Sequence, residues 1–353
     1  INADTPLVRP STLQRLFSCH DSKGAVMTLL SSTTANAEGM GRVVRDSEGN
    51  LVDILEDPDV DATTGSGPSE VNGGAYCFDG SWLWDSLRQI PKSRSGEMYL
   101  TSLVKSASSG GSPVEAVEVD EHQEVLGINN RQQLAEAEAV MRRRIRDHWM
   151  TEGVTMLDPS STFIDAGAML GRDTVLYPNT MVLGHSKIGS ECTIGPGAVI
   201  QDSVVGSGSK VVASFLEDST VEEYVDIGPF SHLRPGAHLE PGVHVGNFVE
   251  IKNSRLGRGV AMGHFGYVGD ASIGANVNLG AGMVTCNYDG VSKHPTVVEE
   301  GAFIGCDTML VAPVTVGTGA TTGAGSVITK DVPPGRLAVG VPATIKAKKV
   351  AYQ

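Results

Sequence analysis

The chain has 353 residues, a formal net charge of −14 at pH 7, 43 glycines and an aromatic content of 5%. This acidic composition argues against non-specific binding to nucleic acid or to an anionic membrane, because both select basic patches. No signal peptide and no apolar run of membrane-spanning length is recognised. The five cysteines follow no CxxC spacing. Neither a disulfide framework nor a zinc site is therefore predicted, and a reducing cytoplasm is the expected location.

Residues 1 to about 130 predict a mixed α/β region, with strands separated by helical stretches. The opening "INADTPL" lacks an initiator Met and is interpreted as a strand entered midway, so a preceding segment is expected. The segment "VVRDSEGNLVDIL" predicts a hairpin that turns at residues 48–50. The segment "GGAYCFDGSWLWDSL" predicts a strand followed by a helix from near Ser81, and "HQEVLGINN" predicts a short strand.

Residues 131 to about 150, "RQQLAEAEAVMRRRIRDHWM", predict one helix. Five apolar residues fall on one face at spacings of three and four: Leu134, Ala137, Met141, Ile145 and Trp149. Four arginines crowd the later half. They are interpreted as a solvated face rather than as a nucleic-acid site, because no aromatic residues interleave with them and the chain is acidic.

From Ile164 onward an aliphatic residue recurs at every sixth position. The first run comprises Ile164, Leu170, Leu176, Val182, Ile188, Ile194 and Ile200, and the pattern resumes after short slips at Ile227, Leu233, Leu239, Val245 and Ile251. It resets at Leu256 and Ile273, stops at "TCNYDGVSKHPT", and returns at Val298. A period of six excludes an amphipathic helix and predicts a β-helix in which each coil stacks its aliphatics on those of the coil before.

Two basic residues hold the same register position within this repeat. Arg234 follows Leu233, and Lys252 follows Ile251, eighteen residues later. Three hexapeptides per coil would place both cations at one corner in adjacent coils, about 4.8 Å apart. Such a pair could bind one phosphate; the alternative is two solvated surface charges.

His264 lies outward by register, twelve residues after Lys252, and is a candidate general base expected to lie close to that lysine along the solenoid. Three further histidines, His232, His238 and His244, are spaced by six and are expected to stack as a ladder along one edge. A metal site formed by these three is the alternative interpretation, disfavoured because zinc requires converging ligands.

The imperfect "[LIV]-G-x-x-x-x" repeats resemble the left-handed β-helix of hexapeptide acyltransferases. Three longer segments, "GHFGYVGDASIGANVNLGAGMVTCNYDG", "HLRPGAHLEPGVHVGNFVEIKNSRLG" and "CDTMLVAPVTVG", resemble the bacterial bifunctional family of UDP-N-acetylglucosamine pyrophosphorylase and glucosamine-1-phosphate N-acetyltransferase. The resemblance implies acetyl transfer from acetyl-CoA to glucosamine 1-phosphate by a homotrimer, with each site built from neighbouring subunits.

The resemblance also implies roles for individual residues. His264 would be the general base, and Asn287 would stabilise the developing oxyanion. The implied sugar-phosphate contacts are Arg234, Lys252, Tyr267, Asn278 and Lys293, Tyr288 would line the acetyl-transfer site with Asn287, and Ala281, Cys306 and Ala324 would line the acetyl-CoA groove. Two departures from the family are expected to affect CoA binding: Cys306 stands where Ser is common, and Val341 stands where some members have Arg, which leaves Arg336 or Lys330 to contact the CoA phosphates.

The first region resembles the uridyltransferase half of the same family. "NADTPL" places the metal ligand at Asp4 with Ala3 beside it, "GMGRVVRD" gives Gly41, "DILED" gives Glu56, "VNGGAY" gives Asn72, and "LGINNRQQL" gives Asn129, the second metal ligand. These residues are expected to bind UDP-N-acetylglucosamine, and Asp4 and Asn129 to bind Mg²⁺. In the family this half transfers uridyl from UTP, giving UDP-N-acetylglucosamine for cell-wall precursors.

The expected organisation is a partial Rossmann-like nucleotidyltransferase domain (1–130), a linker helix (131–155) and a left-handed β-helix acetyltransferase domain (156–353). The family's Gly-rich UTP-binding loop would precede Ile1, so little or no uridyl transfer is expected from the chain as written. The alternative function is a sugar-nucleotide synthase or regulatory subunit whose β-helix only trimerises. Such a protein would not need His264, Asn287, Tyr288 and Lys293.

Overall fold

The computed structural model describes residues 1–56, 68–93 and 96–347. The chain forms two compact units, unit 1 (Ile1–Met141) and unit 2 (Arg142–Gln353), and their boundary falls inside helix α4 (Arg131–Thr151). None of the helices within the described ranges combines the length and apolar content that a membrane crossing requires.

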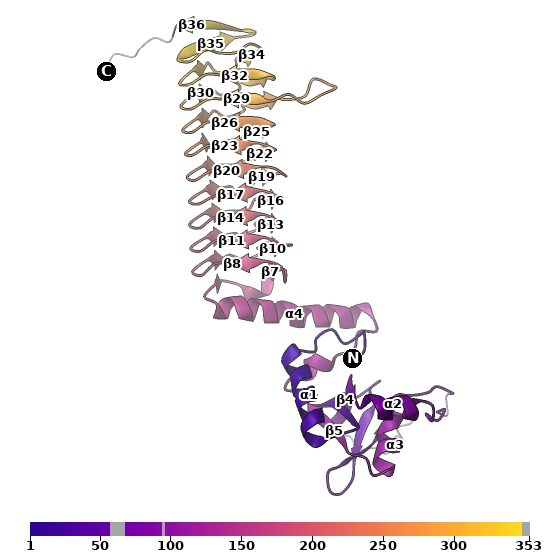
Figure 1. The fold of residues 1–353 in the computed structure, drawn as a ribbon. Helices are drawn as coiled ribbons and strands as arrows, with labels where there is room; N and C mark the ends of the chain where they lie inside the picture. Colours follow the sequence, from indigo (N-terminus) through magenta and orange to yellow (C-terminus); the bar gives the residue numbers. More distant parts are fainter. Residues whose placement is uncertain (57–67, 94–95, 348–353) are drawn as a thin grey trace. The chain divides into compact units, whose positions relative to one another are not determined.

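Unit 1 is built on a mixed five-stranded sheet of order β3-β2-β4-β1-β5 (Figure 1). Strand β1 lies between β4 and β5, and it pairs in parallel with β5 and antiparallel with β4. The elements are α1 (Pro10–Lys23), β1 (Met27–Thr34), β2 (Arg42–Arg45), β3 (Leu51–Leu55), β4 (Ser69–Phe78), α2 (Gly80–Leu87), α3 (Ser102–Ser109), β5 (Val114–Glu118) and the 3₁₀ helix η2 (His122–Val125).

Both faces of β1 are covered, which explains its run of six buried residues. Because successive side chains of a strand point to opposite faces, Leu29 packs in one cluster with Leu103 and Val104 of α3, whereas Leu30 packs with Leu16 of α1. The predicted hairpin is confirmed as β2 and β3. The predicted helix near Ser81 is confirmed as α2, whose first turn is capped by the Asp79 carboxylate accepting from the Trp82 amide.

Two local predictions in unit 1 were wrong. Residues 1–9 form turns rather than a strand, because Thr5 folds back onto the Asn2 carbonyl while the Asn2 amide donates to Gly74. The segment from His122 begins as a 3₁₀ helix, because the buried Glu124 carboxylate turns toward α1 and accepts from the Arg9 amide and the Thr12 hydroxyl.

The predicted helix at residues 131–150 is confirmed as α4, but its predicted apolar face is only partly correct. Ala137 and Val140 are buried with Leu7 in unit 1. Within unit 2, Ile145 and Trp149 pack against the β-helix core. Leu134 and Met141 are 51% and 38% exposed. A single continuous stripe is therefore absent, because the two ends of the helix pack in different cores.

Unit 2 is a parallel β-helix with three faces. Face 1 holds β7 (Phe163–Ile164), β10 (Met181–Leu183), β13 (Val199–Gln201), β16 (Phe215–Glu217), β19 (His232–Leu233), β22 (Val249–Lys252), β25 (Gly266–Gly269), β28 (Val284–Cys286), β31 (Met309–Val311) and β34 (Val327–Ile328). Face 2 holds β8 (Met169–Leu170), β11 (Lys187–Ile188), β14 (Val204–Val205), β17 (Thr220–Val221), β20 (His238–Leu239), β23 (Arg255–Leu256), β26 (Ala271–Ile273), β29 (Thr296–Val298) and β32 (Val314–Val316).

Face 3 runs from the start of the β-helix to its last described strands. It holds β6 (Thr155–Met156), β9 (Val175–Leu176), β12 (Thr193–Ile194), β15 (Lys210–Val211), β18 (Asp226–Ile227), β21 (His244–Val245), β24 (Ala261–Met262), β27 (Asn278–Leu279), β30 (Phe303–Ile304), β33 (Thr321–Thr322), β35 (Arg336–Gly340) and β36 (Ala343–Ala347). A short 3₁₀ helix, η3 (Pro159–Ser161), precedes β7. The coils stack as a column in Figure 1.

The sixfold aliphatic repeat produces this architecture, so the predicted β-helix is confirmed. The seven aliphatics from Ile164 to Ile200 are all buried, with exposed fractions of at most 7%. Across coils, Leu233 pairs with Ile251 and Ile251 with Val268. Each fully buried aliphatic of this size contributes about 1.5–3 kcal/mol through the hydrophobic effect.

The break in the repeat is an excursion of residues 287–295 between β28 and β29. Figure 1 shows it projecting from the column beside β29. The chain rejoins the coil at Thr296, so the predicted return at Val298 is confirmed. Neighbouring strands keep their register across the excursion, since β29 pairs with β26 below and β32 above.

Candidate active site

Two corners of the β-helix carry the polar residues that the sequence singled out. Corner A is the connection from face 3 to face 1, and corner B is the connection from face 1 to face 2. The register confirms the predicted alignment of Arg234 with Lys252, because their preceding residues Leu233 and Ile251 pair directly. Arg234 lies at corner B, and Lys252 lies beside this corner in the next coil, as the last residue of strand β22.

Lys293 joins these two cations from the excursion. The pKa of Lys252 is lowered because the Lys293 ammonium group contacts and repels it, with a smaller contribution from Arg234. Arg234 donates to Glu250 at 2.7 Å. Tyr267 on β25 lies on the same side: its hydroxyl and the Asn287 amide both flank the space beside Gly269, the residue paired with Lys252. Three cations and a phenol therefore surround one position at corner B.

Asp270 was not predicted, yet it connects these groups. Its carboxylate accepts from the Nδ2 of Asn253 at 2.6 Å and from the Nδ2 of Asn287. Partial burial opposes ionisation, but these two hydrogen bonds and the nearby Lys293 and Lys252 charges lower the pKa of Asp270 overall. Asn253, Asp270 and Asn287 are seventeen residues apart in each step, a spacing that matches one coil and could have revealed the set.

The excursion has its own internal hydrogen bonds. The Asp289 carboxylate accepts from the Val291 and Ser292 amides and contacts the His294 imidazole at 2.7 Å. These contacts, led by the Ser292 amide, hold the pKa of Asp289 well below its usual range. The Tyr288 hydroxyl donates to the Gly290 carbonyl, and Tyr288 bridges Lys293 across the excursion. A groove of about 350 Å³ lies beside the excursion, with Asp270, Lys293 and His294 among its walls.

Corner A carries the predicted general base and the residues predicted to line the acetyl-CoA groove. His264, Ala281, Cys306 and Ala324 hold the second position of this corner in four successive coils. His264 lies at one end of this row of four residues, and its side chain is exposed. The three residues beyond it are small, and Cys306 is exposed. Asn278 begins β27 on face 3, in the strand that leads into Ala281. This row at corner A thus consists of three small side chains with an imidazole at one end.

Within one chain, corners A and B lie at opposite ends of each face 1 strand. Strand β25, Gly266–Gly269, separates His264 from Asp270. Four residues of strand span on the order of 13 Å. His264 is therefore not beside Lys252 at the same corner, because the chain crosses face 1 between them, and the expectation of close proximity was wrong.

The expected histidine ladder was also wrong. His232 lies on face 1, His238 on face 2 and His244 on face 3, because six residues advance the chain by one face rather than by one coil. Each imidazole has its own carboxylate partner, Glu217, Glu222 and Asp226 respectively. Side chains on three different faces cannot converge on one metal ion.

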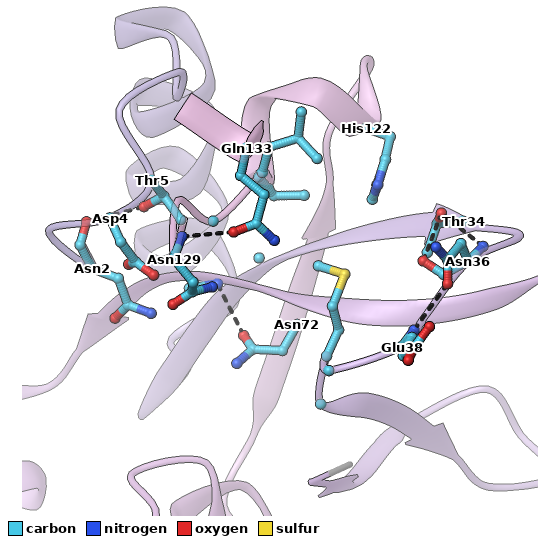
Figure 2. Close-up of a pocket in the computed structure, with 18 of the residues that line it drawn as sticks. Asn2, Asp4, Thr5, Thr34, Asn36, Glu38, Asn72, His122, Asn129 and Gln133 are labelled. Carbon is cyan, nitrogen blue, oxygen red and sulfur yellow. Dashed lines mark hydrogen bonds between the residues drawn. The ribbon is translucent and has the colours of Figure 1, made fainter. Parts of the chain in front are cut away.

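Unit 1 contains a second candidate site, a cavity of about 610 Å³ (Figure 2). Five of the residues predicted there line it together: Asp4, Gly41, Glu56, Asn72 and Asn129. Ala3 is exposed and lies between two lining residues, Asn2 and Asp4. The Asn72 amide group donates to the Tyr76 hydroxyl at 2.6 Å, and Glu56 accepts from Thr101.

The metal ligands predicted in this cavity fit a hard cation. Asp4 and Asn129 approach each other across Gly127: a side-chain carbon at Gly127 would stand 3.3 Å from Asp4 Oδ2 and 3.8 Å from Asn129 Nδ2. The absence of a side chain at Gly127 leaves space between a carboxylate and an amide, both of which supply oxygen ligands that Mg²⁺ accepts. Figure 2 shows Asp4 and Asn129 on one side of the cavity.

Several lining residues of this cavity were missed. They include Thr34, Asn36, Glu38, His122 and Gln133. Burial lowers the pKa of His122, whose Nδ1 lies 3.0 Å from the Ser32 hydroxyl. The signal was available for the first three, since Thr34 ends the buried strand β1 and the other two follow it. Ligands often bind beyond the carboxyl ends of such strands.

Known proteins resemble this chain along almost its whole length. It is 44% identical over 337 residues to the Bifunctional protein GlmU of Geobacillus sp. (strain WCH70), covering 95% of this chain and 73% of that protein. The chain belongs to the GlmU family of bifunctional proteins. The GlmU of Heliobacterium modesticaldum is 47% identical over 337 residues, again covering 95% of this chain and 73% of the relative. A family model described as bacterial transferase hexapeptide (six repeats) matches residues 167–202 and 295–330.

The GlmU family assignment confirms the resemblance recognised from the sequence. It also accounts for both parts of the fold, the α/β unit and the hexapeptide β-helix, and supports the left-handed winding that the resemblance implied. The two matched hexapeptide segments lie on either side of the coils that carry Arg234, Lys252 and His264. The interval between the two segments also contains all of the excursion except its last residue.

Proposed function

We propose that this chain transfers the acetyl group of acetyl-CoA to the amine of glucosamine 1-phosphate. The observation that carries the proposal is the convergence of Arg234, Lys252 and Lys293 at corner B of an otherwise acidic protein. Mutual repulsion of cations costs free energy in the absence of an anion, and a phosphate would relieve it. A sugar phosphate is thus the substrate class that these residues fit.

The reaction needs a base and an oxyanion donor. His264 would take a proton from the substrate ammonium group and release it to solvent, which leaves a free amine. The amine attacks the thioester carbon. As the C–S bond breaks, the same nitrogen loses a second proton, which His264 passes to the departing CoA sulfur, so that the amide and the free CoA thiol are formed. Asn287 gives one N–H of its amide group to Asp270. Its second N–H remains to stabilise the negative charge that develops on the thioester oxygen. Ala281, Cys306 and Ala324 would offer the strip along which CoA lies.

We further propose that the active enzyme is a homotrimer whose sites combine corner A of one copy with corner B of the next. The separation of His264 from the corner B cations across face 1 supports this arrangement. Mixing two inactive variants tests it. His264→Ala and Lys252→Met chains, denatured and refolded together, should regain activity, since some sites in the mixed trimers carry both native residues. Failure to regain activity, with mixed trimers present, contradicts a composite site.

Acetyl transfer itself is measured by thiol release from acetyl-CoA on addition of glucosamine 1-phosphate. The chain should release thiol only when the sugar phosphate is present. An absence of sugar-dependent thiol release by a folded chain would contradict the proposal and favour a β-helix that only trimerises.

For unit 1 we propose binding of UDP-N-acetylglucosamine with Mg²⁺, as the product side of uridyl transfer from UTP. The polar cavity with Asp4 and Asn129 across Gly127 supports it. When bound, Mg²⁺ neutralises phosphate charge. Together the two units would supply UDP-N-acetylglucosamine for cell-wall precursors. Titration calorimetry should detect binding of UDP-N-acetylglucosamine only when Mg²⁺ is present. In Asp4→Ala, addition of Mg²⁺ should no longer produce detectable binding.

A further inference from the structure

Three side chains at corner B form a polar ladder across successive coils. Asn253, Asp270 and Asn287 each follow a face 1 strand, and the register stacks them one above the other. The central carboxylate receives one amide N–H from below and one from above. A carboxylate accepts only, whereas an amide has both a donor and an acceptor end, so Asp270 forces both asparagines to turn their nitrogens toward it.

The upper asparagine is the residue to which we assign the oxyanion. Asn287 is 7% exposed, so few alternative orientations are open to it. With one N–H held by Asp270, the second N–H of the same planar group has a fixed direction. An ionised acceptor also makes a stronger hydrogen bond than a neutral one.

We propose that Asp270 is a positioning residue for acetyl transfer, acting by fixing the orientation of the Asn287 amide. This inference rests on the proposed acetyltransferase function. Asp270 also lies close enough to Lys252 and Lys293 for its charge to act on both. It therefore partly offsets the positive charge that attracts the substrate phosphate, and its two effects on catalysis have opposite signs.

The backbone of Asp270 has a separate structural role that a substitution can preserve. Its amide donates to the Lys252 carbonyl, and its carbonyl accepts from Thr296, where the excursion rejoins the coil. Its φ of 51° lies in the left-handed region, which Asn tolerates as well as Asp. Asp270→Asn thus keeps the backbone bonds and the side-chain shape. It offers a single oxygen to two amide donors, so one of them faces a nitrogen.

The test compares kcat and KM of Asp270→Asn with those of the unmodified chain. We expect kcat to fall by roughly 10- to 100-fold. This is less than the roughly 100- to 1,000-fold loss that follows direct removal of an oxyanion donor, because the Asn287 amide is misoriented rather than removed. The KM for glucosamine 1-phosphate should stay unchanged or fall, since removal of a negative charge strengthens the attraction for phosphate. A purely structural role would raise KM and lower kcat together.

Asp218→Asn is the matched control. Asp218 lies at the same corner with a left-handed φ of 40°, two coils below Asn253, and its side chain is exposed. This variant should keep the kcat of the unmodified chain. A comparable loss of kcat in Asp218→Asn would show that the corner carboxylates act through the fold and would overturn the inference.

A double-mutant cycle isolates the contact with Asn287. In an Asn287→Ala background, Asp270→Asn should change kcat by less than about 3-fold, because the amide that it orients is already absent. An undiminished effect in that background would show that Asp270 acts by another route and would overturn the inference. An unmodified chain that fails to acetylate glucosamine 1-phosphate overturns the proposed function itself, which separates the two failures.

Discussion

Gly127 offers the sharpest test of the cation site in unit 1. Gly127→Ala adds one methyl group whose carbon would stand 3.3 Å from Asp4 Oδ2, which is tighter than ordinary van der Waals contact. The Asp4 carboxylate must therefore shift by a few tenths of an ångström. Because Mg²⁺ requires nearly ideal octahedral geometry with oxygens at about 2.0–2.1 Å, a displacement of this size weakens the metal site.

We expect the Kd for Mg²⁺, measured by calorimetry with UDP-N-acetylglucosamine present, to rise about tenfold, which corresponds to about 1.4 kcal/mol. Gly80→Ala is the matched control in unit 1, because nothing lies within 4 Å of the added carbon. That variant should bind Mg²⁺ normally. Unchanged Mg²⁺ affinity in Gly127→Ala, alongside an intact fold, would refute the placement of the ion between Asp4 and Asn129.

Three further predictions concern unit 2. His264→Ala should lower kcat for acetyl transfer by at least about 100-fold, as expected for loss of a general base. The melting temperature of this variant should stay unchanged, because the side chain is exposed. Retained activity in the thiol-release assay would show that His264 is not the base. Lys293→Met should raise the pKa of Lys252, since Lys293 is the main cause of its lowered value. Substrate binding, followed as KM for glucosamine 1-phosphate, should then be lost at higher pH than in the unmodified chain. If the loss of binding occurs at the same pH or at a lower pH, the charge coupling between the two lysines is contradicted. Leu233→Ala removes a fully buried side chain and should lower the free energy of unfolding by about 2–5 kcal/mol; a urea-unfolding midpoint equal to that of the unmodified chain would contradict the stacked core.

The fold could be predicted from the sequence where one periodicity dominated. A period of six specifies the coil, and Leu233 and Ile251 pair as the repeat requires. The same arithmetic failed for the three histidines, because a step of six in a three-faced coil moves to the next face, whereas steps of seventeen or eighteen return to the same corner. Applied consistently, that rule would have separated His264 from Lys252.

The site was only partly predictable for a related reason. Residue type and shared register marked Arg234 and Lys252 as candidates, and the family resemblance marked Asp4 and Asn129. Neither signal singled out Asp270. Its role depends on which amides meet its carboxylate, and those contacts join residues seventeen positions away on either side. In helix α4 the sequence pattern was clear, but it predicted one apolar stripe. The structure instead packs the two ends of the helix in separate cores.

The excursion at residues 287–295 leaves the strands around it undisturbed, with β26, β29 and β32 paired in unbroken register. A solenoid corner therefore behaves as an insertion point: residues can be added there without moving the hydrophobic column behind it. Loops of different length and chemistry could be exchanged between Cys286 and Thr296 while the coil stays the same. In such a scaffold, substrate preference can change when the residues of one corner loop are replaced, independently of the stability that the remaining coils provide.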